Sequence, residues 1–161
     1  MICTHLFWLF PLLFIIHDLE ELIFMAPWLN KHAANVSKRF PRIAPIFKHY
    51  TTRGMTFAVA EELLLCVVLT IGCYHGLGAL WFGALTAYTI HLFVHLVQCA
   101  VLRQYVPAVV TSIACLPFSL ILMLKTSYLA QGNAGWVIAG ILLVIVNLII
   151  IHKLCFRSHN K

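Results

Sequence analysis

The chain has 161 residues, of which 62% are hydrophobic and only 10% are charged, and its mean hydropathy is +0.95. These values exclude an ordinary soluble domain and favour a compact integral membrane protein. The net charge of +6 would suggest nucleic-acid binding in a soluble protein. In a membrane protein it reflects topology and contact with anionic lipid headgroups, so we expect the lipid bilayer as a partner and no nucleic acid.

Five apolar runs are long enough to cross a hydrocarbon core of about 30 Å as helices. In chain order they cover roughly residues 4–29, 54–74, 78–102, 105–124 and 134–152. Lipid offers no partner for an open sheet edge, so helices are the natural assignment for such continuous runs. The sequence therefore predicts an all-α fold, in which residues 1–161 form one integral membrane bundle of five transmembrane helices.

The basic residues predict how this bundle is oriented. Ten of the eleven Lys and Arg lie in the 30–53 connection, at Arg103 or in the tail from Lys153. With five spans these three regions share one side of the membrane, and only Lys125 lies on the other. The positive-inside rule then places the N-terminus outside and the C-terminus in the cytoplasm.

All five acidic residues lie inside apolar runs. Three of them, Asp18, Glu20 and Glu21, follow His17 in the first run, and Glu61 and Glu62 interrupt the second. The third run carries two histidines four residues apart, in the segment H-L-F-V-H at 91–95. A charged group inside a bilayer costs a few kcal/mol, so intramembrane ionisable residues are candidates for a functional site.

These polar residues are expected to meet at one depth. With a rise of about 1.5 Å per residue, Glu21, Glu61 and His95 each lie about 12 Å from the cytoplasmic end of their span. Thr111 and Asn147 lie about 8–9 Å in from the same side. Three helices therefore bring polar groups to one level in the cytoplasmic half of the bundle, and the last two spans add milder polarity nearby.

The helical positions of these residues agree with their depth. On the first span His17, Glu20 and Glu21 share one face, whereas Asp18 points away from it. Glu61 and Glu62 are about 100° apart, so which of them faces the site stays open. The third span carries one polar stripe, made of Tyr88, His91, His95 and Gln98.

Glutamate and histidine together form a mixed ligand set that suits zinc, iron or manganese. No Lys or Arg lies in the spans at this depth, so the carboxylates must be protonated, pair with histidinium or bind a cation. Helical bundles also build di-metal sites from inward-pointing Glu and His. We therefore expect one or two divalent metal ions, zinc or iron first. The expected metal ligands are His17, Glu20, Glu21, Glu61, His91 and His95.

Further roles follow from this assignment. A glutamate that binds no metal could act as a general base, and the expected catalytic residues are Glu62 and Glu20. Polar residues at the same level are expected to flank and orient the ligands. These are Tyr88, Gln98, Thr111 and Asn147.

The chain resembles the HXXEE domain family of small multi-spanning membrane proteins, which are mostly bacterial. The segment His17-Asp18-Leu19-Glu20-Glu21 fits the motif that names the family, and the motif lies near the N-terminus, as it does there. The resemblance continues through Glu61, His91, His95 and Tyr105-Val106-Pro107. The family usually has Pro-Gly at this last point, where this chain has Pro107-Ala108. The resemblance implies a bacterial cytoplasmic membrane and supports the candidate residues, but the family is named for its motif and supplies no reaction.

We expect a metal-dependent integral membrane enzyme that acts on an amphiphilic or lipid-like substrate. Zinc would favour hydrolysis, and iron would favour oxidation. The alternative hypothesis is a proton-coupled transporter or metal-ion permease that uses the same cluster. A third hypothesis is a structural membrane subunit. The extracellular halves of the spans are almost wholly apolar, which favours an enzyme that opens to one side.

Overall fold

The computed structural model describes residues 4–39, 41 and 50–155. Within these residues the chain forms five long α-helices and two short 3-10 helices, with no strand. The elements in order are η1 (Thr4–Trp8), α1 (Leu9–Arg39), α3 (Thr52–Cys73), α4 (Gly78–Leu102), α5 (Val109–Thr126), η2 (Ser127–Ala130) and α6 (Ala134–Cys155). The prediction of an all-α bundle is confirmed.

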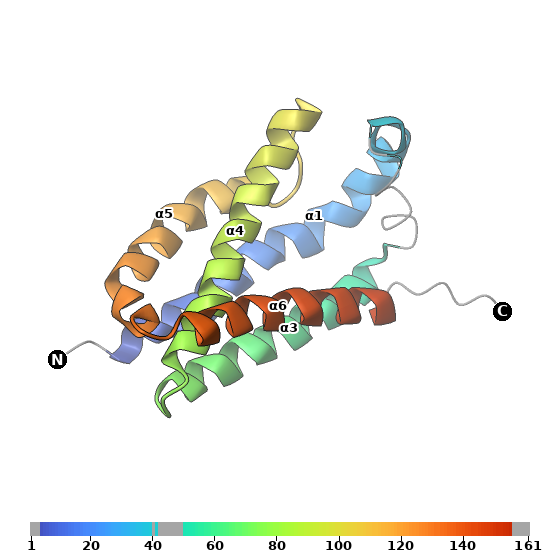
Figure 1. The fold of residues 1–161 in the computed structure, drawn as a ribbon. Coiled ribbons are helices and arrows are strands. Elements are labelled where there is room, and N and C mark those ends of the chain that lie inside the picture. The colour runs from blue at the N-terminus through green and yellow to red at the C-terminus, as the bar shows by residue number, and fades with distance from the viewer. Residues whose placement is uncertain (1–3, 40, 42–49, 156–161) are drawn as a thin grey trace.

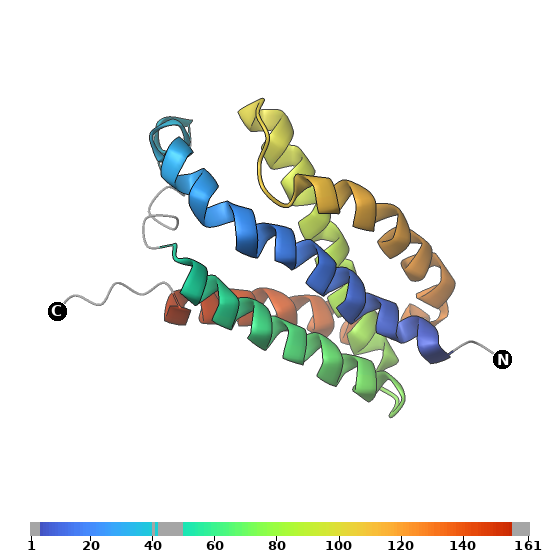
Figure 2. The same cartoon turned by 180° about the vertical axis from the view of Figure 1, so that it is seen from behind.

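Helix α4 lies at the centre of the bundle and packs against α3, α5 and α6 (Figure 1). Helix α1 packs against α3 and α5, and Figure 2 shows it running between these two helices on the opposite face of the molecule. The α4–α5 connection and the end of α1 lie at one end of the bundle, and the start of α1 lies at the other. Helices α1 and α4 thus face each other across the interior.

Four segments are long and apolar enough to cross a membrane: Thr52–Cys73, Gly78–Leu102, Val109–Ala130 and Ala134–Cys155. Their outer surfaces suit lipid, since α6 buries only Gly140 and exposes Ile, Leu and Val side chains. Helix α1 has 31 residues, or about 46 Å, but its apolar part carries three carboxylates. Its crossing of the membrane stays a prediction, which its position between α3 and α5 supports.

Helix α1 extends ten residues beyond the end of the predicted first span at residue 29. Pro27 lies inside the helix without ending it, because a proline removes one backbone hydrogen bond and neighbouring contacts can hold the helix together. Here Trp28 donates from Nε1 to the Tyr105 carbonyl at 2.8 Å, and Arg39 donates to the Val101 carbonyl at 2.7 Å. Both bonds tie the end of α1 to the end of α4 and the connection that follows it.

Helix α5 begins at Val109, four residues later than the predicted fourth span. The connection before it bends through two residues with positive φ, Arg103 at 51° and Ala108 at 75°. Ala108 is fully buried and is the N-cap of α5. Left-handed backbone favours glycine. Ala108 therefore has a Cβ where the backbone conformation disfavours one.

Replacing Ala108 with glycine is expected to stabilise the protein. Relief of the left-handed strain is worth roughly 1–2 kcal/mol, and the greater freedom of glycine in the unfolded chain offsets about half of that. The net gain should be on the order of 0.5–1 kcal/mol, measured as a higher melting temperature in nonionic detergent. Ala130→Gly, at the end of η2, is the comparison and should not stabilise the protein. A lower melting temperature for Ala108→Gly would contradict the strain assigned to this residue.

The aromatic core fixes the position of α1 along its axis relative to α4. Phe10 and Tyr88 pack with ring centroids 5.7 Å apart, and Trp81 packs edge-on against Phe10 at 5.9 Å. The Tyr88 hydroxyl also donates to the backbone carbonyl of Leu13 at 2.8 Å. This bond lies one helical turn before His17, so it fixes the position of the HXXEE segment relative to α4.

Candidate metal centre

Two pairs of residues on facing helices form a compact cluster. His17 and Glu21 are four residues apart on α1, and His91 and His95 are four residues apart on α4. This spacing places both members of a pair on the same side of their helix. One ligand atom from each of the four residues lies within 4.8 Å of all the others. We call these four residues the His/Glu cluster.

The distances within the His/Glu cluster suit a single ion. The Nε2 atoms of His91 and His95 are 3.0 Å apart, and Oε2 of Glu21 lies 4.0 Å and 3.8 Å from them, respectively. The ring centroid of His17 lies 5.2 Å from that of His91 and 5.0 Å from that of His95. Ligand bonds of about 2.0–2.1 Å in a tetrahedral site place donor atoms about 3.3 Å apart. Small side-chain shifts would therefore bring all four atoms around a divalent ion.

The hydrogen bonds of Thr111 favour one tautomer of His17. The Thr111 hydroxyl makes its shortest hydrogen bond to Oε2 of Glu20, at 2.7 Å, and Nδ1 of His17 lies 3.2 Å from the same hydroxyl. A hydroxyl that gives its one proton to Glu20 can only accept from His17, which favours a proton on Nδ1. Nε2 of His17 is then left with a lone pair, and it is buried without a hydrogen-bond partner. A metal-binding histidine shows this arrangement, with its second nitrogen held by a hydrogen bond.

Glu20 lies outside the His/Glu cluster and binds the start of α5. Its two oxygens accept hydrogen bonds from the Tyr105 hydroxyl at 2.7 Å, the Thr111 backbone N–H at 2.8 Å and the Thr111 hydroxyl. The carboxylate thus caps the first turn of α5, since the methyl side chain of Ala108 cannot accept a hydrogen bond. Burial, together with the hydrogen bond to Glu20, raises the pKa of Tyr105 to about 12, so the phenol stays protonated and remains a donor.

The two glutamates of α3 share one partner but face different surroundings. The Asn147 side-chain amide donates to Glu61 Oε2 at 2.8 Å and to Glu62 Oε1 at 3.0 Å. Glu62 is buried and lines a cavity, whereas Glu61 does not line it. Neither belongs to the His/Glu cluster. The sequence left open whether Glu61 or Glu62 faces the interior, and in the structure it is Glu62.

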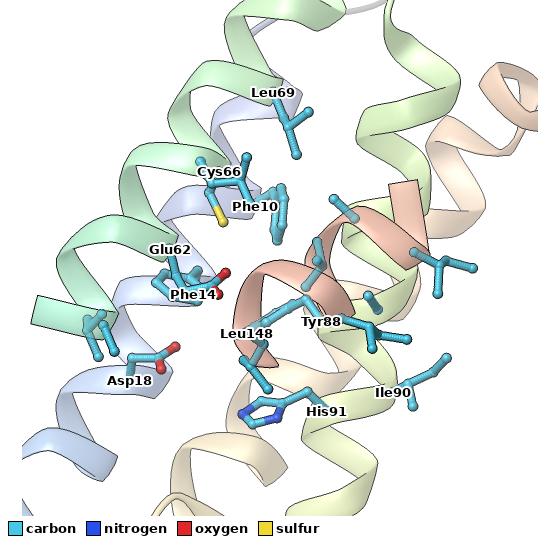
Figure 3. Close-up of a pocket in the computed structure, with 18 of the residues that line it drawn as sticks. Phe10, Phe14, Asp18, Glu62, Cys66, Leu69, Tyr88, Ile90, His91 and Leu148 are labelled. Atoms are coloured by element: carbon cyan, nitrogen blue, oxygen red, sulfur yellow. The ribbon is translucent and has the colours of Figure 1, made fainter. Parts of the chain in front are cut away.

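The cavity has a volume of about 280 Å³ and lies beside the His/Glu cluster, between α1, α3, α4 and α6. Glu21 and His91 belong to the cluster and also line the cavity. In Figure 3, Asp18 and Glu62 point into it from one wall, and His91 lies on the opposite wall. Much of the remaining lining is apolar, including Phe10, Phe14, Leu65, Leu69, Ile141 and Val144. The cavity can therefore hold an apolar group close to the cluster.

Asp18 is the polar residue whose position the sequence did not predict. It was expected to point away from the site, but its side chain is buried and lines the cavity. Its direction on α1 is as the helical geometry predicts. Helical periodicity does not reveal that α3, with Glu62, lies on that side of α1, so no pattern in the sequence could have located Asp18.

The four polar residues that were expected to flank the ligands differ in which side chains they contact. Tyr88 meets the His17 ring edge-on, with the centroids 6.0 Å apart. Gln98 interacts with the His95 side chain from the next turn of α4. Thr111 joins His17 to Glu20, as described above, whereas Asn147 contacts only the glutamates of α3 among these groups.

The comparisons with known proteins identify the family of the chain. Residues 8–122 match the family model described as "Protein of unknown function with HXXEE motif". This match includes α1, α3, α4 and most of α5, and thus all four residues of the His/Glu cluster. No curated protein and no solved structure matched the chain. The family model covers well over half of the sequence, and the protein therefore belongs to the HXXEE family.

Proposed function

We propose that the protein is a metal-dependent membrane enzyme that binds one divalent ion through His17, Glu21, His91 and His95. The observation that carries this proposal is the buried, unpartnered Nε2 of His17 beside three further ligand atoms. Glu20 and Glu61, the other expected ligands, have hydrogen-bond partners outside the His/Glu cluster. This favours one ion over two and gives Glu20 the role of orienting His17 through Thr111.

Three imidazoles and one carboxylate suit zinc best, with iron and manganese as further candidates. Such an ion would polarise a substrate oxygen or lower the pKa of a bound water molecule. The His91 side chain is 37% exposed and lines the cavity, so substrate would reach the site from this side. Glu62 lines the same cavity and is placed to take a proton there as a general base.

The shape of the cavity favours an enzyme over a transporter. A transporter needs polar access from both ends, but beyond the cavity the bundle is closed by the aromatic core, where Phe10 and Trp81 are almost fully buried. The apolar walls favour an amphiphilic substrate with its reactive polar group near His91. With the orientation that the basic residues predict, the site would lie in the cytoplasmic half of the membrane.

Elemental analysis of protein purified in nonionic detergent tests the proposal. We expect about one equivalent of zinc, iron or manganese per chain, and a fall in melting temperature when a chelator removes it. An ion present at a hundred times its dissociation constant stabilises the folded state by about 2.7 kcal/mol. Protein that purifies without metal, and whose melting temperature is unchanged by added Zn²⁺, Fe²⁺ and Mn²⁺, would overturn the proposal.

Replacing Thr111 with valine is expected to lower metal affinity roughly 10–100-fold. Valine has nearly the same shape but lacks the hydroxyl that accepts from Nδ1 of His17 and donates to Glu20. Competition with a fluorescent chelator measures the affinity. Ser112→Ala is the control, because it removes a hydroxyl from the same turn of α5 that has no hydrogen-bond partner. Equal affinities for the two variants would show that Thr111 does not orient His17.

A further inference from the structure

We propose that the cavity binds the ammonium group of a cationic amphiphile between Asp18 and Glu62, with the alkyl chain along its apolar walls. This inference names a substrate class for the site proposed above, and it rests on that proposed function in taking the bound amine to occupy the cavity that Glu21 and His91 of the metal site also line. The binding itself needs only the cavity and its two carboxylates. An alkyl amine is the simplest molecule of this class.

The charges that line the cavity favour a cation. Three carboxylates line it, those of Asp18, Glu21 and Glu62, and no Lys or Arg of the described residues does so. Glu21 faces His91 and His95, and Oε1 of Glu62 accepts from Asn147, which leaves Asp18 and the other oxygen of Glu62 for a ligand. A buried carboxylate is unfavourable unless a cation or hydrogen-bond donors compensate for the lost water. An anionic amphiphile would meet repulsion at the same place.

Asp18 shows which kind of partner is missing. Its side chain is 6% exposed and lines the cavity, and Oδ2 has no hydrogen-bond partner. An ionised carboxylate can only accept, so a partner that holds Asp18 in its charged form must donate. A primary ammonium group has three N–H donors and can reach two carboxylates at once, whereas an alcohol has a single donor. Asp18 and Glu62 come from different helices and point into the same space, as Figure 3 shows.

The walls and the opening of the cavity account for the alkyl chain. From the two carboxylates the lining continues along Phe14, Cys66 and Leu69, which are apolar. Ile90 of α4 and Leu148 of α6 line the cavity and are also exposed on the outer surface of the bundle. The cavity therefore reaches the surface between these two helices, on the side that lipid would cover. A single-chain amphiphile could enter there directly from the membrane.

Binding of radiolabelled decylamine to the purified protein in nonionic detergent tests the inference, with decanol and decanoate as competitors of equal chain length. We expect decylamine to bind at least tenfold more tightly than decanol, and decanoate not to compete. Equal binding of decylamine and decanol, stronger binding of decanoate, or no saturable binding of decylamine would overturn the proposal. This selectivity is measured on the native protein, so it tests whether the cavity binds an ammonium group even if a variant fails to fold.

Two nearly isosteric variants locate the binding site. Asp18→Asn and Glu62→Gln are each expected to weaken decylamine binding about tenfold or more, while decanol binding changes little. Glu61→Gln is the matched control, since it removes the same charge one residue away from Glu62 and outside the cavity lining. It should leave decylamine binding unchanged. A folded Asp18→Asn protein with native affinity for decylamine, or an equal loss in Glu61→Gln, would overturn the assignment.

The metal content of the same samples separates the two proposals. Protein that purifies without metal and is not stabilised by added Zn²⁺, Fe²⁺ or Mn²⁺, but that prefers decylamine over decanol, would retain the amine site and overturn the metalloenzyme. Protein that purifies with metal but shows no preference for decylamine would retain the metal site and overturn the amine site. The metal content is therefore determined on the protein as purified, before any treatment with a chelator.

Discussion

Replacing Glu21 with glutamine is expected to reduce the metal content of the purified protein to about a tenth of that of the native protein or less. Glu21 supplies the only carboxylate of the His/Glu cluster, and a neutral amide is a far weaker ligand for a divalent ion. Elemental analysis of detergent-purified protein is the measurement. Glutamine also removes a buried negative charge, so without metal the variant should be no less stable than the native protein.

Two controls distinguish the loss of a ligand from a general effect of charge. Glu61→Gln removes a carboxylate outside the His/Glu cluster and should leave the metal content unchanged. Glu20→Gln removes the acceptor of the Thr111 hydroxyl and should weaken metal binding without abolishing it. A Glu21→Gln protein with a full complement of metal would show that this carboxylate is not a ligand. It would leave the three histidines of the His/Glu cluster as ligands.

Replacing Gly83 or Gly140 with alanine is expected to destabilise the bundle by about 2–4 kcal/mol. The two glycines lie where α4 crosses α6. A Cβ on Gly83 would lie 2.2 Å from the Val137 carbonyl oxygen, and one on Gly140 would lie 2.2 Å from the Leu80 carbonyl oxygen. These obstacles are backbone atoms, so the helices themselves would have to separate. Close approach through small residues is a common basis of helix packing in membranes.

Thermal unfolding in nonionic detergent measures this effect, and Gly135→Ala is the matched control. Gly135 lies on α6, five residues before Gly140, and a Cβ there would have nothing within 4 Å. Alanine at that position should be neutral or stabilise the helix by up to about 1 kcal/mol. Since α4 and α6 both line the cavity, separation of these helices should also weaken decylamine binding. Unchanged melting temperatures for both Gly83→Ala and Gly140→Ala would contradict the close crossing.

Much of the fold could be read from the sequence, because lipid leaves long apolar segments little choice but to form helices. Rise per residue then gave the depths of Glu21 and His95, and the spacing of the histidines gave their common face. The structure brings these groups together with His17 and His91. Residues that share a depth and face the interior meet once the helices are packed.

The tertiary structure alone decided which glutamate joins the His/Glu cluster. Glu20 and Glu21 are about 100° apart on α1 and both could face inward. Their roles differ because α5 lies on the side of Glu20 and offers it the N–H and hydroxyl of Thr111, while the histidines of α4 lie on the side of Glu21. The packing of α3 against α1 likewise puts Glu62 on the side to which Asp18 points. Helical periodicity fixes the direction of a side chain relative to its own helix, but which neighbour lies in that direction depends on how the helices pack.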